Sequence, residues 1–220
     1  MKKLLALLML MATALLPESS LGKDKAGKAD QLAKAVWKAS GGEHWPNVKE
    51  IDFTFAVEKS GTIVMQAEHH WDVAAQTDEV KWKGKDVKVN LADPAQDADA
   101  KAAYARWVND SYWLLAPLKL RERGVKLAAE GTKEMDGAKR EVLQLSFDQV
   151  GLTPNDHYLL YIDPATKRVA SWDYMPKPGV TSHGTWEDYK QSGGLTLATN
   201  HKMQGDVRIR ILNLNVVDAK

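Results

Sequence analysis

The sequence predicts an α+β protein that is mainly antiparallel β-sheet, with two helices and one curved sheet of about ten or eleven strands. Three observations support this class. Apolar and polar residues alternate with period two in many short runs. Turn residues separate consecutive runs, which pairs neighbouring strands antiparallel. Helical periodicity occurs in only two segments. A sheet of this size tends to curl or close instead of staying flat.

Residues 1–22 have the three-part pattern of a secretory signal peptide. Met1–Lys3 is positively charged, Leu4–Leu16 is apolar apart from one threonine, and the small residues up to Gly22 suit cleavage. The apolar run is too short to span a bilayer comfortably, and no later stretch approaches the ~20 residues that a membrane helix needs. A buried N-terminal helix is the alternative for this segment. We expect residues 23–220 to be an exported, soluble, periplasmic single domain.

The chain has no cysteine and a balanced charge. A lipoprotein needs a cysteine directly after its signal peptide, so we expect neither a lipid anchor nor disulfides. There are 30 basic and 29 acidic residues. The predicted signal peptide contains Lys2, Lys3 and Glu18, so the mature chain is formally neutral. Neutrality gives no electrostatic reason to expect binding to nucleic acid or to an anionic membrane.

The first helix is predicted over residues 29–39, where apolar residues recur at helical spacing before the stop at Gly41-Gly42. The period then changes to two. Residues 51–58 and 63–71 alternate as half-buried strands, and Ser60-Gly61 turns the chain between them. Two short strands follow, joined by a tight hairpin at Lys83-Gly84-Lys85.

Asp93-Pro94 is predicted to open the second helix, with Asp93 as N-cap, and the helix is predicted to end near Asn109-Asp110. In the last strand the apolar phase slips between Ile211 and Leu212, which predicts a bulge or a strand covered on both sides. The remaining predicted strands are Val80–Trp82, Val87–Leu91, Tyr112–Leu115, Val125–Ala129, Glu141–Phe147, His157–Ile162, Arg168–Tyr174, Thr185–Tyr189, Leu195–His201 and Val207–Val217.

Sequence motifs of the common enzyme classes are absent. There is no nucleophile elbow, no dinucleotide-binding glycine motif and no zinc-protease motif. Gly22–Lys28 nearly matches a phosphate-binding loop, but Ala29 stands where serine or threonine is required. We therefore expect no cofactor.

The histidines give little support for a metal or a catalytic centre. His69 and His70 point to opposite faces of one strand and cannot bind one metal together. We expect His69 to be a hydrogen-bonded core histidine, and His70 to belong to a polar, solvated row. No pair of carboxylates has a spacing that indicates acid–base catalysis. The other histidines considered lie on separate strands or loops: His157, His183 and His201.

Two aromatic-rich stretches, Trp107–Lys119 and Asp156–Tyr174, are apolar on both faces of their predicted strands. Such strands must be covered on both sides. In a curved sheet one cover is a helix and the other is a cavity or a plug. Core packing and pocket lining both remain open interpretations. By strand face, the candidate cavity-wall residues are Met65, Trp71, Trp113, Leu115, Leu160 and Trp172.

These stretches resemble the LolA-like periplasmic lipoprotein-carrier and outer-membrane lipoprotein-sorting superfamily, and are closest to a secreted branch of it. Trp107–Gly124, with Tyr-Trp-Leu-Leu-x-Pro-x-Lys-Leu, and Gly151–Tyr174 carry the resemblance. It implies an incomplete, half-open β-barrel covered by helices, with an apolar cavity for acyl chains. In the carriers, an arginine of an early strand helps close the lid. The matching residues Ala67–Asp72 contain no clear counterpart.

The leading hypothesis is a monomeric, non-enzymatic carrier that holds a lipid, an acyl chain or another apolar small molecule, with a role in envelope lipid or lipoprotein handling. One alternative is a hydrolase-like enzyme whose histidines and acids are brought together by the fold. The other is an interaction module that presents its tryptophans to an envelope protein, for which a large exposed apolar patch is expected.

Overall fold

The structure, a computed structural model, describes residues 20–94, 97–148 and 151–218. Residues 1–19 of the predicted signal peptide lie outside this part, and residues 20–22 begin the first helix. The elements in chain order are α1 (Ser20–Ala39), η1 (Gly42–Asn47), β1 (Val48–Lys59), β2 (Thr62–Asp72), β3 (Thr77–Trp82), β4 (Lys85–Asn90), α2 (Ala98–Lys119), β5 (Val125–Met135), β6 (Ala138–Phe147), β7 (His157–Ile162), β8 (Val169–Lys177), β9 (Val180–Thr185), β10 (Lys190–Ser192), β11 (Leu195–Leu197), β12 (Asn200–Met203) and β13 (Val207–Asp218).

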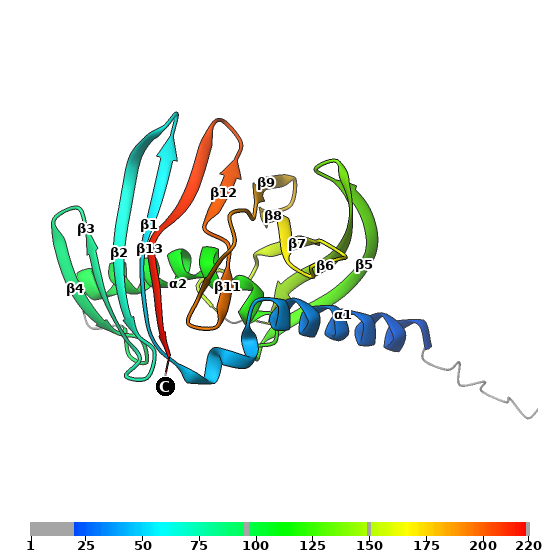
Figure 1. Ribbon diagram of the computed structural model, residues 1–220, viewed down its shortest axis with the longest axis horizontal. Helices are drawn as coiled ribbons and strands as arrows, with labels where there is room; N and C mark the ends of the chain where they lie inside the picture. Colours follow the sequence, from blue (N-terminus) through cyan, green and yellow to red (C-terminus); the bar gives the residue numbers. More distant parts are fainter. Residues whose placement is uncertain (1–19, 95–96, 149–150, 219–220) are drawn as a thin grey trace, which may run out of the picture.

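Eleven strands form one curved antiparallel sheet in the order β4-β3-β2-β1-β13-β12-β9-β8-β7-β6-β5 (Figure 1). β4 and β5 are its two edges, so the sheet is an incomplete half-barrel. The short strands β10 and β11 pair separately. The predicted fold class and strand number are confirmed. Pairing of β1 with β13 joins the first and the last strand near the middle of the sheet.

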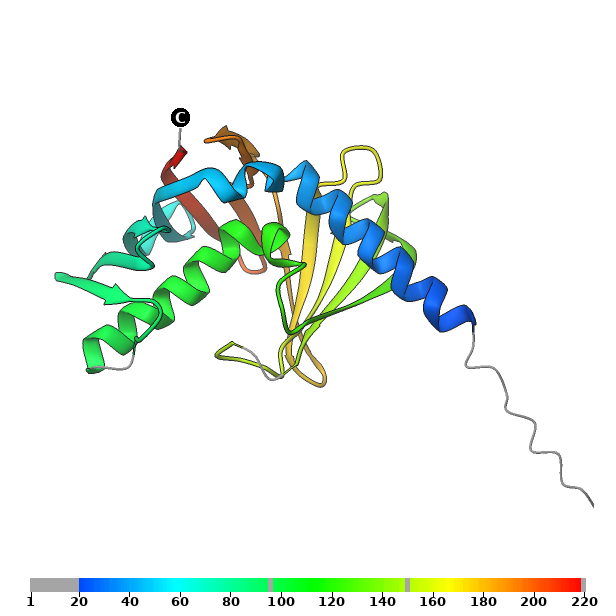
Figure 2. The ribbon, with the colours of Figure 1, turned by 90° about the horizontal axis from the view of Figure 1, so that it is seen from below.

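Both helices cover the concave face. α1 contacts β5 and β6, α2 contacts β3 and β4, and the two helices meet each other. Figure 2, in which α1 is blue and α2 is green, shows each helix lying along a different half of the sheet. Three groups of buried apolar residues fill the space between sheet and helices. No helix in the described ranges is long and apolar enough to cross a membrane.

The predicted irregularity in the last strand is a bulge. Asp52 pairs with Asn215 and Thr54 pairs with Leu212, so β13 has one residue more than β1 over this stretch. Asn213 lies within the extra residues, with φ 54°. Asparagine tolerates this left-handed conformation better than most residues. The extra residue exchanges the two faces of β13, which explains the slip in its apolar pattern.

The predicted hairpin between β3 and β4 is also confirmed. Lys83 has φ 47° and Gly84 has φ 75°. Two consecutive residues with positive φ make the two-residue turn whose twist matches that of the flanking strands. Glycine at the second position carries no Cβ penalty there.

The second helix differs from the prediction at both ends. It begins after Asp97, whose carboxylate accepts a hydrogen bond from the Ala100 N–H at 2.8 Å. Asp93 is therefore not the N-cap. The helix continues to Lys119, so the predicted end near Asn109 and the predicted strand Tyr112–Leu115 are wrong. A short aromatic run fits period two and period 3.6 equally well, and here the helical period holds.

Two further predicted strands differ in their bounds. Thr185 ends β9, whereas Trp186–Tyr189 lies between β9 and β10 and makes only one isolated bridge, from Glu187 to Asn200. The predicted strand Leu195–His201 is divided into β11 and β12. Its first part pairs with β10 and its second with β13, so the chain changes partners between them.

Candidate ligand-binding site

An aromatic cluster lies where α2 crosses the concave face. It consists of four rings, each in contact with two of the others: Trp113 of α2, Trp172 of β8, Trp186 from the segment between β9 and β10, and His201 of β12. Ring centroids are 4.7 Å apart for Trp113–Trp172, 5.1 Å for Trp172–Trp186, 4.7 Å for Trp186–His201 and 5.2 Å for His201–Trp113. Trp113 is therefore the ring that α2 contributes to the aromatic cluster, where it contacts both Trp172 and His201.

His201 is a neutral member of the aromatic cluster. Its Nδ1 lies 3.0 Å from the Thr185 carbonyl oxygen and donates a hydrogen bond to it. Burial disfavours the charged imidazolium and lowers the pKa of His201 to about 4. The ring is thus uncharged at neutral pH and packs as an aromatic group.

A second, ionic contact joins α2 to the sheet. His69 Nδ1 lies 2.7 Å from Asp78 Oδ2 on β3, and His69 Nε2 lies 3.1 Å from Asp110 Oδ2 on α2. The side chains of His69, Asp78 and Asp110 are 0%, 0% and 2% exposed. We refer to these three residues as the Asp–His–Asp bridge. It places two carboxylates and one imidazole in a water-poor interior.

The protonation of His69 follows from these contacts. Burial disfavours the imidazolium, but hydrogen bonds to Asp110 and Asp78 and their negative charges outweigh it, so the pKa of His69 is raised. The ring of Phe53 stacks on His69 at 4.5 Å. The prediction of a hydrogen-bonded core histidine is confirmed. Its two partners lie 9 and 41 positions away in sequence on other elements, and sequence spacing did not reveal them.

A groove of about 390 Å³ lies between α1 and strands β5 and β6. We call it the α1 groove. Five of its ten lining residues are small or apolar, including Leu32, Ala35 and Ala129. Lys28 and Lys167 also line it, and Lys167 is paired with Glu141. It is an opening on the concave side, next to the free edge of the sheet.

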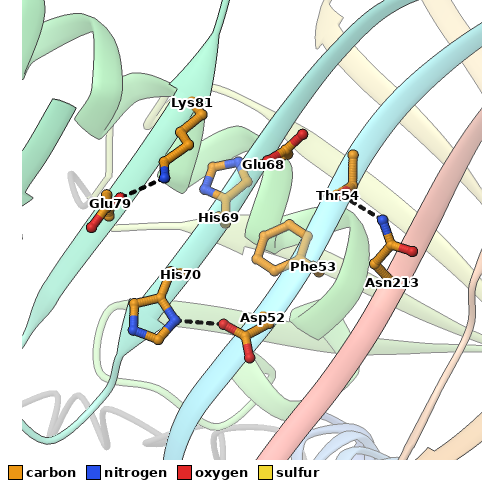
Figure 3. Close-up of a pocket in the computed structure, with 9 residues that line it drawn as sticks. All are labelled: Asp52, Phe53, Thr54, Glu68, His69, His70, Glu79, Lys81 and Asn213. Carbon is orange, nitrogen blue, oxygen red and sulfur yellow. Dashed lines mark hydrogen bonds and ion pairs between the residues drawn. The ribbon is translucent and has the colours of Figure 1, made fainter. Parts of the chain in front are cut away.

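The opposite face of the sheet has a polar hollow of about 310 Å³, shown in Figure 3. His70 Nδ1 lies 2.5 Å from Asp52 Oδ1, and Lys81 Nζ lies 2.8 Å from Glu79 Oε1. The hydrogen bond to Asp52 raises the pKa of His70 despite slight desolvation. The predicted assignment of His70 to an exposed polar row is confirmed. Its exposed charged groups have the character of a solvated surface.

The other histidines do not form a metal site. His183 Nδ1 lies 2.7 Å from Asp173 Oδ1, whose other oxygen accepts a hydrogen bond from Tyr161. His157 is exposed. Within the described residues, no three or more His, Cys, Asp or Glu side chains are placed to hold a metal ion.

The six candidate wall residues all lie between the concave face and the helices. Trp71 and Leu115 are buried in the apolar group around α2, with Met65 packed against it. Leu160 and Trp172 are buried in the group that includes α1. Trp113 contacts both groups, on a helix and not on the strand face assigned to it. None of the six lines the α1 groove or the polar hollow.

Two members of the aromatic cluster were not among the candidates. Trp186 and His201 lie on segments whose observed strand bounds differ from the predicted ones. The sequence pattern therefore does not assign these two side chains to a face of the sheet. The sequence carries no clear signal for His201, because polar Thr199 and Asn200 separate it from the apolar residues Leu195, Leu197 and Ala198.

Comparisons with known proteins identify the fold. No family model matches the sequence, and no curated protein matches it. A solved domain from Vibrio parahaemolyticus, named for outer-membrane lipoprotein sorting, aligns at TM-score 0.51 and 11% identity over 87% of this chain and 93% of its own. A LolA superfamily protein from Nitrosomonas europaea aligns at TM-score 0.50 and 9% identity over 86% and 94%. The chain has the LolA-like fold, as its resemblance implied.

Proposed function

We propose that this protein is an exported, periplasmic carrier that binds a lipid or another apolar ligand between the concave face of its sheet and α2. The observation that carries the proposal is the composition of that interface. Three tryptophans and His201 meet there, one of the tryptophans on the covering helix. The proposed wall is Met65, Trp71, Trp113, Leu115, Leu160 and Trp172.

A ligand would replace α2 as the cover of the concave face. Burying apolar surface is worth about 0.8 kcal/mol per methylene, so a chain of ~14 methylenes contributes on the order of 11 kcal/mol. This gain would offset part of the apolar contacts that α2 gives up when it moves aside, among them those of buried Leu114 and Leu115. Exchange of helix for ligand therefore needs no large preformed cavity.

The α1 groove is the proposed access route. It lies on the concave side, and its residue Leu32 packs against the buried group that contains Ala29 and Ala33 of α1. Ala35 and Ala129 are small, which leaves width between helix and strand. The fold and name of the Vibrio and Nitrosomonas neighbours support a carrier role by analogy.

The two alternatives receive less support. For an enzyme, His69 has carboxylate partners and is among the residues around the polar hollow, but the three side chains are at most 2% exposed. For an interaction module, the described exposed large apolar residues are few and come from four separate segments of the chain: Ile63 with Val64, Leu152, Val180 and Val217.

The proposal is tested with delipidated protein and vesicles of bacterial phospholipid. Native mass spectrometry should detect bound lipid after incubation, and tryptophan fluorescence should change with lipid concentration. Ala35→Trp fills the α1 groove and should slow lipid uptake at least tenfold. Lys34→Trp, on the exposed side of the same helix, is the matched control. Only apo protein, with unchanged fluorescence, would exclude the function. Equal uptake by both variants would exclude the groove as the route.

A further inference from the structure

The Asp–His–Asp bridge depends on a proton. With His69 protonated, one positive charge lies between two carboxylates in a buried site. Once His69 is neutral, Asp78 and Asp110 remain as two buried negative charges beside a ring that can donate only one hydrogen bond. Removing one partner of a buried ionic group is strongly destabilising, because it leaves uncompensated charge. The bridge is therefore stable only while His69 carries its second proton.

Among the residues that the structure describes, no other charged group contacts Asp78 or Asp110 in place of His69. Asp78 faces it from β3 and Asp110 from α2, while β1 contributes the uncharged ring of Phe53. On β2 itself, the neighbours Glu68 and His70 alternate to the opposite face of the strand, around the polar hollow whose lining also includes His69. On α2, Arg106 is directed to Met65 and Trp82, and Asn109 donates to Asp110 Oδ1 at 2.7 Å.

The bridge also joins the two elements that a ligand must separate. Asp110 lies on α2 one turn before Leu114, which is buried against the sheet. His69 and Asp78 lie on β2 and β3. Loss of the bridge therefore weakens the hold of α2 on the concave face, while the strands remain joined by their own ladders. The consequence is local opening at α2, not global unfolding.

We propose that the Asp–His–Asp bridge is a pH-sensitive latch that holds α2 on the sheet while His69 is protonated and releases it, exposing the ligand site, when His69 loses its proton. This regulation rests on the proposed binding function. The pKa of His69 is raised above 6.5, so the latch is fully closed below pH 6.5 and opens as the pH rises through the raised value. Opening coupled to loss of one proton increases up to about tenfold per pH unit.

Hydrogen exchange of α2 amides, corrected for intrinsic rates, tests the latch between pH 6 and pH 10. The wild-type chain should show α2 opening that rises with pH. His69→Gln should open at all values with no pH dependence. His70→Gln is the matched control, because the neighbouring histidine pairs with Asp52 on the other face, and it should keep the wild-type profile. The same pH profile in His69→Gln, or a flat wild-type profile, would overturn the proposal.

Two measurements keep the test decisive if His69→Gln does not fold. NMR titration of the wild-type imidazoles should show His69 titrating at the pH where α2 opens, and a mismatch of more than one unit would reject the latch. Asp110→Asn, which keeps the shape of the side chain, should shift opening to lower pH. Exchange needs no ligand, so opening without lipid uptake would reject the proposed function and leave the latch standing.

Discussion

At the scale of single residues, two buried histidines show how the same ring is used in opposite ways. His69 is surrounded by carboxylates and its pKa is raised, whereas His201 is surrounded by aromatic rings and its pKa is lowered to about 4. Their pH effects on stability are therefore opposite in sign and separate in range. The protonation of His69 changes stability above pH 6.5, and that of His201 changes stability below pH 6.5.

We predict that His201 makes the protein acid-sensitive. The unfolded chain binds a proton to His201 near pH 6.5 and the folded chain only near pH 4, so stability falls as the pH is lowered through this range. The loss between pH 7 and pH 4.5 should be about 2 kcal/mol. Urea unfolding of wild type and His201→Gln at both pH values measures it.

The variant should lose that part of the pH dependence, and exposed His157→Gln should retain it. Equal pH dependence in wild type and His201→Gln would contradict the prediction, because it would show that the pKa of His201 is the same in the folded and unfolded chain.

At the scale of elements, the sequence pattern predicted strands better than helices. Alternation of apolar and polar residue types identified β1 and β2; β2 has one buried face, whereas β1 is buried on both faces from Phe53 to Ala56. The predicted α2 ends too early, because the aromatic run in its second half fits the strand period of two as well as the helical period. The bridge could not be predicted at all, since the partners of His69 come from β3 and α2 and meet only through the fold.

The start of α2 provides a direct test of this difference. Asp97→Ala should cost about 1 kcal/mol of stability, because its carboxylate caps the Ala100 N–H. Asp93→Ala removes the aspartate that the sequence pattern favoured as N-cap, and it should change stability by less than about 0.5 kcal/mol. Thermal or urea unfolding of both variants measures the difference. A larger effect at Asp93 would contradict the observed helix start.

At the scale of the whole molecule, the curvature of the sheet could be predicted from the sequence, but the position and lining of the groove on its concave side could not. Strand number and turn chemistry favour a curled antiparallel sheet from sequence alone. The six candidate wall residues do lie on the concave side, as strand or helix faces, yet the α1 groove is lined by other residues. Its width depends on how α1 sits against β5, and no local pattern encodes that distance.

β13 joins the two halves of the sheet, with β1–β4 on one side and β12 to β5 on the other. We predict that ending the chain at Asp206 abolishes the single cooperative unfolding transition, because both halves lose a long apolar neighbour. Ending it at Asp218 should preserve the transition. Circular dichroism during urea unfolding distinguishes the two. A truncated chain that still unfolds in one sharp step would show that β1 finds another partner.

Because β1 pairs with β13, it remains without this neighbour until the end of the chain has been synthesised. About 150 residues separate the two strands in the chain, and synthesis proceeds at roughly 5–20 residues per second, so β1 spends on the order of 10–30 s without its neighbour. During that time one edge of a long strand is free to pair with other chains. The nascent protein therefore needs protection from aggregation until its last strand has been made.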